Sequence, residues 1–269
     1  MQTTPLHRGK KYQVWAPTDI FFRDATALSA LLDGQHWGNP LYNWPVMAAD
    51  GYRWWIARVR SALRQVDLVR FDHFRGFAQA WHIPAGESTA RNGQWVDGSG
   101  KALFDAIRSA VGSLPLIAED LGLITPDVDA LREGLGLPGM RVLQFMLGKP
   151  QNLYQPHNYE PNTACYTGTH DNDTSAGWYA KLNDKDRYDF GEYVGHDVPN
   201  GARELVRLAW SSVAKLAIAP LQDLFSLGSE ARMNVPGLAA GNWQWRFRSE
   251  QFEPQIVEWM AGLTARYNR

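Results

Sequence analysis

Short apolar runs alternate along this chain with stretches of helical periodicity, and this alternation constrains the fold more than any other feature. Helices are predicted at 48–65, 101–111, 125–134, 174–183, 199–217 and 251–267. Strands are predicted at 66–71, 114–119, 140–147, 163–169 and 221–228. Alternating strands and helices predict an α/β fold with a parallel sheet. A closed (β/α)₈ barrel needs eight strands, so either some strands are missed or the chain forms part of a barrel.

The composition fits a globular protein that binds a neutral ligand. The 269 residues carry a net charge of −1, which creates no long-range field for nucleic acid or anionic lipid. The first residues lack the apolar core of a signal peptide, and no apolar run is long enough to span a membrane. The single cysteine, Cys165, excludes an internal disulfide and favours a reducing compartment. We therefore expect a cytoplasmic protein with no nucleic-acid or membrane partner.

Three of the apolar runs lead into motifs that carry carboxylates. RFDHFRG places Arg70 and Asp72 on one face of a strand, where the arginine keeps the carboxylate ionised and oriented. LIAEDLG places Glu119 behind apolar residues, which raise the pKa of a carboxyl group as a general acid requires. YTGTHDND places Asp171 after a third run. Three acids at the ends of separate strands predict a site that cleaves bonds between sugars.

The first two acidic motifs also fit a structural role. Arg70 and Asp72 can form a purely structural ion pair. Glu119 or Asp120 can cap the segment that follows, and Asp120 is expected on the face opposite Glu119. The motif around Glu119 alone is weak support for catalysis.

Metal and nucleotide chemistry find little support in the sequence. A calcium loop beginning at Asp171 has Ala176 and Leu182 where glycine and glutamate are required. A transition-metal site there has one histidine and no nearby cysteine. GLGLPG at 134–139 matches GxGxxG but follows a predicted helix and precedes a strand, the reverse of a dinucleotide-binding turn. We expect no metal and no cofactor.

Taken together, these motifs resemble the amylomaltase family, the 4-α-glucanotransferases or disproportionating enzymes of the α-amylase clan. The similarity runs from residue 37 to residue 246 through WGNPLYNW, RFDHFRG, IAEDLG, LPGMRVLQF, YTGTHDNDT, EARMNVPG and NWQWR. It implies a (β/α)₈ TIM-type barrel with a retaining mechanism. Residues 1–36 match the family poorly, whereas residues 37–269 correspond to the catalytic barrel portion. Family members are longer, so we expect the N-terminal strands of the barrel to be missing from this chain.

The resemblance implies a role for each matched site residue. Asp72 would be the nucleophile, Glu119 the acid/base and Asp171 the third acid, which binds sugar hydroxyls and stabilises the transition state. The other implied residues orient Asp72 or bind the glucan: Trp37, Asn39, Arg70, His73, Asp120, His170, Asn172 and Asn234.

The activity that the resemblance implies is transfer of α-1,4-glucan segments between maltooligosaccharides, with a maltooligosaccharide or α-glucan as substrate. Two alternatives stay open: an α-glucan hydrolase of the same clan, and a truncated, inactive fragment that binds glucan. An open barrel leaves strand edges unpaired. We therefore expect the chain alone to aggregate or show little activity unless a complementing N-terminal fragment supplies the missing strands.

Overall fold

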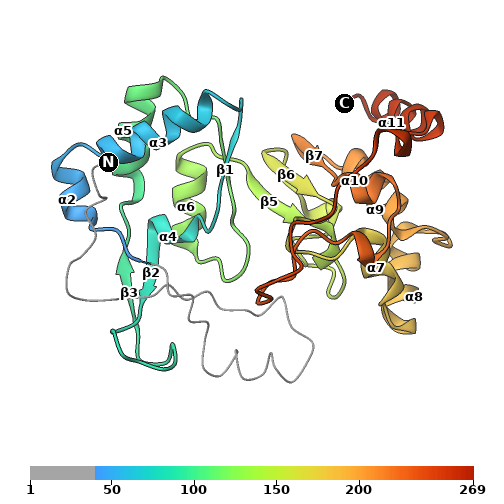
Figure 1. The fold of residues 1–269 in the computed structure, drawn as a ribbon, viewed down its shortest axis with the longest axis horizontal. Coiled ribbons are helices and arrows are strands. Elements are labelled where there is room, and N and C mark those ends of the chain that lie inside the picture. Colours follow the sequence, from blue (N-terminus) through green and yellow to red (C-terminus); the bar gives the residue numbers. More distant parts are fainter. Residues whose placement is uncertain (1–39) are drawn as a thin grey trace. The chain divides into compact units, whose positions relative to one another are not determined.

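The computed structural model describes residues 40–269, which divide between Gly139 and Met140 into two compact units (Figure 1). Each unit has its own strands and its own buried core, and the two are described separately. The predictions for residues 1–36, and the predicted substrate-binding residues Trp37 and Asn39, lie outside the described residues.

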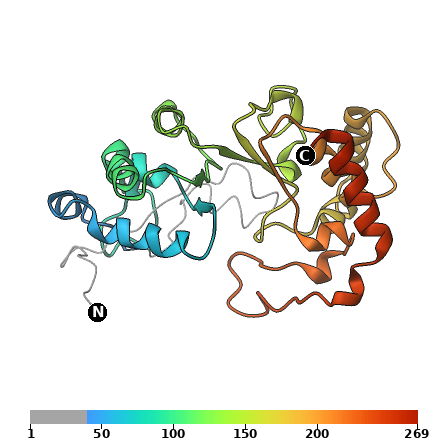
Figure 2. The same ribbon diagram turned by 90° about the horizontal axis from the view of Figure 1, so that it is seen from above.

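The first unit is built on two parallel strands, β1 (Val69–Phe71) and β4 (Leu116–Ala118). Their first residues pair with each other and so do their last, so the two strands end in register. Helices α3 (Arg53–Leu63) and α5 (Gly100–Val111) lie side by side in both views (Figures 1 and 2). Parallel strands that end together place the residues after them at one edge of the sheet.

The predicted apolar stripe of α5 forms the centre of this unit's core. Leu103, Phe104 and Ile107 are fully buried, as their spacing of one turn predicts. The ring of Phe104 lies 5.5 Å from that of Phe74 and 6.0 Å from that of Phe71, at the end of β1. Burial of each such side chain contributes about 1.5–3 kcal/mol. This packing fixes the strand end from which the first acidic motif projects.

Among the described residues 40–139, the first unit also contains three further helices and a hairpin. The helices are α2 (Trp44–Ala49), α4 (Arg75–Ala78) and α6 (Pro126–Gly134). The antiparallel hairpin of β2 (Gln79–His82) and β3 (Gln94–Asp97) was not predicted from the sequence.

The single helix predicted at 48–65 is wrong, because the chain forms α2 and α3 with a break between them. Gly51 has φ 69° and Tyr52 has φ 57°, both in the left-handed region that a continuous helix cannot contain. The amide of Tyr52 donates to Met47 O at 2.7 Å and closes the turn.

The second unit contains a three-stranded sheet in the order β5 (Gly139–Val142), β6 (Thr163–Tyr166) and β7 (Leu216–Ile218). β6 and β7 pair in parallel. The helices are α7 (Ser175–Ala180), α8 (Asp184–Val194), α9 (Gly201–Ser211), α10 (Leu221–Leu224) and α11 (Pro254–Tyr267). Short 3₁₀ turns are η1 (Leu143–Phe145), η2 (Pro156–Asn158), η3 (Ser229–Ala231) and η4 (Ser249–Gln251).

Two predicted elements of the second unit are wrong. The helix expected at 199–217 ends at Ser211, and its last residues form β7 instead. The strand expected at 221–228 is the short helix α10, which begins directly after Pro220. Short apolar runs suit both a buried strand and a buried helix. Here Pro220, which lacks an amide donor, separates the strand from the helix.

Cys165 lies in the middle of β6 and is fully buried. Burial raises the pKa of its thiol to about 12. Such a thiol is unreactive near neutral pH and acts as a small apolar side chain.

The predicted α/β class with parallel strands is confirmed in each unit. The sheets formed by residues 40–269 have two or three strands each. A closed eight-stranded barrel therefore stays a prediction.

Candidate active site

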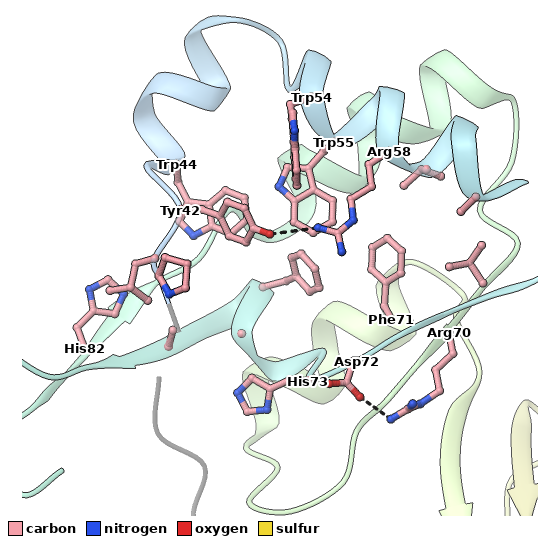
Figure 3. Close-up of a pocket in the computed structure, with 18 residues that line it drawn as sticks. Tyr42, Trp44, Trp54, Trp55, Arg58, Arg70, Phe71, Asp72, His73 and His82 are labelled. Atoms are coloured by element: carbon pink, nitrogen blue, oxygen red, sulfur yellow. Dashed lines mark hydrogen bonds and ion pairs between the residues drawn. The ribbon is translucent and has the colours of Figure 1, made fainter. Parts of the chain in front are cut away.

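The first acidic motif projects from the end of β1. The Nη2 atom of Arg70 donates to Oδ1 of Asp72 at 2.6 Å, so the predicted pair is formed (Figure 3). The Asp72 side chain is 79% exposed. The carboxylate is therefore held by an arginine on one side and open to a ligand on the other.

Glu119 follows β4 directly, as Asp72 follows β1. Because Phe71 pairs with Ala118, the two acids occupy equivalent positions at the end of adjacent parallel strands. The backbone amides of His73 and Leu121 donate to the Glu119 carboxyl at 2.5 and 3.2 Å. These bonds fix the carboxyl group at the edge of the sheet beside Asp72.

The pKa of Glu119 is raised to about 7, as its apolar surroundings predict. Desolvation is the largest cause, and the negative charge of Asp72 adds to it. The charge of Arg70 and the amide bonds from His73 and Leu121 oppose the rise without cancelling it. A carboxyl group with this pKa is partly protonated near pH 7, so it can donate a proton and later accept one.

His73 connects the two acids through its backbone. Its φ is 48°, in the left-handed region that non-glycine residues adopt rarely. Its amide donates to Glu119, and desolvation lowers the pKa of its imidazole although Asp72 opposes that effect. Backbone strain of this kind is concentrated at functional sites.

Asp120 lies in different surroundings from Glu119. Its side chain is 1% exposed and its Oδ2 lies 3.3 Å from Nε of Arg132 on α6. A Cβ atom at Gly139 would stand 2.3 Å from the same oxygen, so only glycine fits there. Its buried ion pair fits a structural role for Asp120, and the substrate-binding role that the resemblance implies stays a prediction.

A cavity of about 700 Å³ opens beside Asp72 in the first unit (Figure 3). Aromatic rings and the Arg58 guanidinium form the wall opposite the acid; the rings belong to Tyr42, Trp44, Trp54 and Trp55. The cavity is large enough for a ligand of several rings.

The third acidic motif belongs to the second unit and follows β6. Asp171 accepts from Nδ2 of Asn234 at 2.5 Å, and Nε2 of His170 lies 3.3 Å from its other oxygen. The structure thus brings together three of the predicted site residues of this unit. Asn172 instead closes the turn, because its Oδ1 accepts from the amide and the hydroxyl of Thr169 at 2.9 and 2.8 Å.

Arg232 is a site residue that the sequence did not single out. It donates to the backbone carbonyl of Asp171 at 2.6 Å and to that of Asn234 at 2.8 Å. It therefore joins the two segments that carry these side chains.

A buried polar network supports the same loop. Asp223 accepts from the hydroxyl of Thr167 at 2.5 Å and from the amide and hydroxyl of Ser175 at 2.7 Å. Asp173 is held by Lys181 at 2.5 Å and Ser229 at 2.7 Å. Apart from Lys181, which is eight positions from Asp173, these partners are 48 to 56 positions apart, so no local pattern could reveal them.

The two parts of the predicted site lie on different units. Arg70, Asp72, His73 and Glu119 belong to the first unit, and His170 and Asp171 to the second. Convergence of Asp171 with Asp72 and Glu119 therefore stays a prediction.

Two further findings on residues 40–269 concern metal ions and membranes. No group of three histidine, cysteine or acidic side chains in this range could hold a metal ion. No helix in the same range is both long and apolar enough to cross a membrane.

Known proteins of one family resemble this chain over most of its length. The family model for 4-alpha-glucanotransferase matches residues 11–251. The 4-alpha-glucanotransferase of Synechocystis sp. is 47% identical over 88% of this chain, and that of Thermus thermophilus 42% identical over 90%. The amylomaltase of Streptococcus agalactiae, solved in complex with acarbose, superposes with a TM-score of 0.86 at 35% identity over 96% of this chain.

The chain spans about half the length of the relatives that it matches. The aligned part covers 48% of the Synechocystis protein, 52% of the Thermus protein and 51% of the Streptococcus agalactiae amylomaltase.

Proposed function

Because the chain belongs to the 4-alpha-glucanotransferase family, we propose that it transfers α-1,4-glucan segments between maltooligosaccharides. One observation carries the proposal: Asp72, exposed and paired with Arg70, stands beside Glu119, whose pKa is raised to about 7. A retaining enzyme of this kind needs a carboxylate nucleophile and a carboxyl group that can give and take a proton.

The proposed reaction is a double displacement. Glu119 donates its proton to the glycosidic oxygen while a carboxylate oxygen of Asp72 attacks the anomeric carbon, and the shorter glucan leaves as an alcohol. Glu119 then removes the proton from the 4-hydroxyl of an incoming glucan, which displaces Asp72. Two inversions retain the α configuration, and the mechanism predicts carboxyl groups about 5–5.5 Å apart.

Arg70 supports the first step in this proposal. Its ion pair with Asp72 leaves the other carboxylate oxygen available to the anomeric carbon. The backbone amides on Glu119 keep that carboxyl group oriented while its protonation changes.

The side chains of the second unit complete the proposed substrate site. We assign Asp171 the role of third acid, with His170 and Asn234 as neighbours that bind sugar hydroxyls; the contacts among them support this grouping. Asn172 and Asp120 act by holding their loops, as their internal bonds indicate. Trp37 and Asn39 keep the glucan-binding role that the resemblance implies.

The predicted barrel and the predicted location also belong to the proposal. That residues 37–269 form the catalytic part of a (β/α)₈ barrel rests on the family resemblance and on parallel strands in both units. The cytoplasmic location rests on the lone buried Cys165. None of the comparisons supports a complementing N-terminal fragment, which stays a prediction.

Incubation of the folded chain with maltotriose tests the proposal. A transferase converts maltotriose into glucose and a ladder of longer chains, which chromatography resolves. The Asp72→Asn variant is the matched control, since it removes the nucleophile and keeps the side-chain volume nearly unchanged. Steady release of reducing sugar without longer chains would indicate a hydrolase. A folded sample that forms no product would instead favour an inactive fragment that binds glucan.

A further inference from the structure

The loop between η3 and η4 is fixed by its own hydrogen bonds. Oδ1 of Asn242 accepts from the amide of Val235 at 2.9 Å, and its Nδ2 donates to the carbonyl of Leu238 at 2.9 Å. The amide of Trp243 donates to Met233 O at 2.7 Å. The backbone that carries Trp243 is therefore held in place before any ligand binds.

Trp243 occupies an unfavourable position for a large side chain. Its φ is 63°, in the left-handed region that bulky residues rarely adopt. The residue is 53% exposed, and the centre of its ring lies 5.2 Å from that of the His170 ring. Burial in a core thus does not explain why a tryptophan stands here. Strained positions that hold an exposed side chain are characteristic of ligand-binding sites.

The indole and His170 line a cavity of about 230 Å³ in the second unit. The rest of its lining mixes two apolar residues, Pro220 and Met233, with polar and charged ones such as Asn172, Asp173 and Arg232. Such a cavity suits a ligand that has an apolar face and a polar rim. A pyranose ring has this character, since its C–H groups form two flat faces and its hydroxyls lie around the edge.

We propose that Trp243 is a substrate-binding residue against which one glucosyl ring of the glucan stacks. This inference rests on the proposed function and extends it, because it adds an aromatic platform to the loop of Asp171. His170, between the platform and Asp171, is half-exposed and can donate or accept a hydrogen bond at the same sugar. The ring in the cavity is thereby fixed next to the third acid.

Calorimetric titration of the full chain with maltoheptaose tests the proposal. Trp243→Gly is the informative variant, because glycine suits φ 63° and removes only the indole. We expect it to weaken binding about tenfold, the effect of losing one stacked ring. Trp243→Phe keeps an aromatic face and should bind within about threefold of the unchanged chain.

A matched control separates stacking from a general effect of losing an exposed aromatic side chain. Tyr188 on α8 is 65% exposed and does not line the cavity, so Tyr188→Ala should bind maltoheptaose like the unchanged chain. Urea unfolding of Trp243→Gly should give an unchanged or higher midpoint, because the strain is relieved.

Three outcomes would overturn the inference. Equal binding by Trp243→Gly and the unchanged chain would show that Trp243 does not contact the substrate, and the proposed function would stand. Weaker binding together with a lower unfolding midpoint would show that the indole has a structural role. Absence of maltoheptaose binding by the folded, unchanged chain would overturn both the proposed function and this inference.

Discussion

The raised pKa of Glu119 makes the stability of the chain depend on pH in a way that one substitution can reveal. The pKa rises from its ordinary value of 4.5 to about 7, chiefly through desolvation. Each pKa unit corresponds to about 1.4 kcal/mol, so the charged carboxylate is disfavoured in the fold by about 3 kcal/mol. Glu119→Gln removes the ionisation and keeps the shape of the side chain.

The direction of the effect follows from the raised pKa. Protonated Glu119 is favoured in the fold, so its contribution is fully present below about pH 4.5 and is lost as the pH rises through about 7. Between pH 5 and pH 8 this group should lower the free energy of unfolding by about 2–3 kcal/mol. Glu119→Gln should lack this part of the pH dependence.

Urea unfolding at pH 5 and pH 8, followed by tryptophan fluorescence, measures the difference for both proteins. The change in unfolding free energy between the two pH values should be larger for the unchanged chain than for Glu119→Gln, by about 2–3 kcal/mol. An equal change in both proteins would refute the reasoning, since Glu119 would then ionise in the fold as it does in water.

The charges around Glu119 predict opposite effects of two neighbouring substitutions. Asp72→Asn should lower the pKa of Glu119 because it removes a negative charge, whereas Arg70→Met should raise it because it removes a positive one. Carboxyl ¹³C NMR titration measures both, with the Glu119 signal identified by its loss in Glu119→Gln. Shifts in the same direction would contradict the assigned coupling.

Three further predictions concern the structural support of the site. Arg132→Met should lower the free energy of unfolding in urea by about 3–5 kcal/mol, because it leaves Asp120 buried without its charged partner; a loss below about 1 kcal/mol would contradict this. Asp223→Ala should cost about 1–3 kcal/mol in the same assay, since buried donors lose their acceptor, and an unchanged midpoint would count against the network. Arg232→Met should accelerate amide hydrogen exchange around Asp171, measured by mass spectrometry, and exchange at the original rate would show that the arginine does not hold that loop.

The first part of the candidate site was predictable because short-range rules determine it. Arg70 and Asp72 share a face because alternate residues of a strand do, and Glu119 joins them because β1 and β4 are adjacent and in register. The flanking apolar residues correctly predicted the raised pKa of Glu119. Each of these features depends on a few consecutive residues or on one pair of adjacent strands.

Other features depend on contacts that a local pattern does not contain. The break between α2 and α3 depends on the left-handed Tyr52, and the amphipathic pattern runs across it. The strand–helix exchange around Pro220 shows that apolar content alone does not determine backbone conformation. The roles of Asp223 and Arg232 depend on partners 48 to 61 positions away. Long-range polar contacts of this kind become visible only in the fold.

Trapping the covalent glycosyl intermediate tests the central claim most directly. Glu119→Gln slows release of the glycosyl group from the nucleophile, and a maltosyl fluoride donor needs no proton for its leaving group. Peptide mass spectrometry after incubation should find the added sugar on the peptide that carries Asp72, and none after the additional change Asp72→Asn. A sugar attached to another residue, or a folded sample that carries none, would contradict the assignment of Asp72 and Glu119 as nucleophile and acid/base.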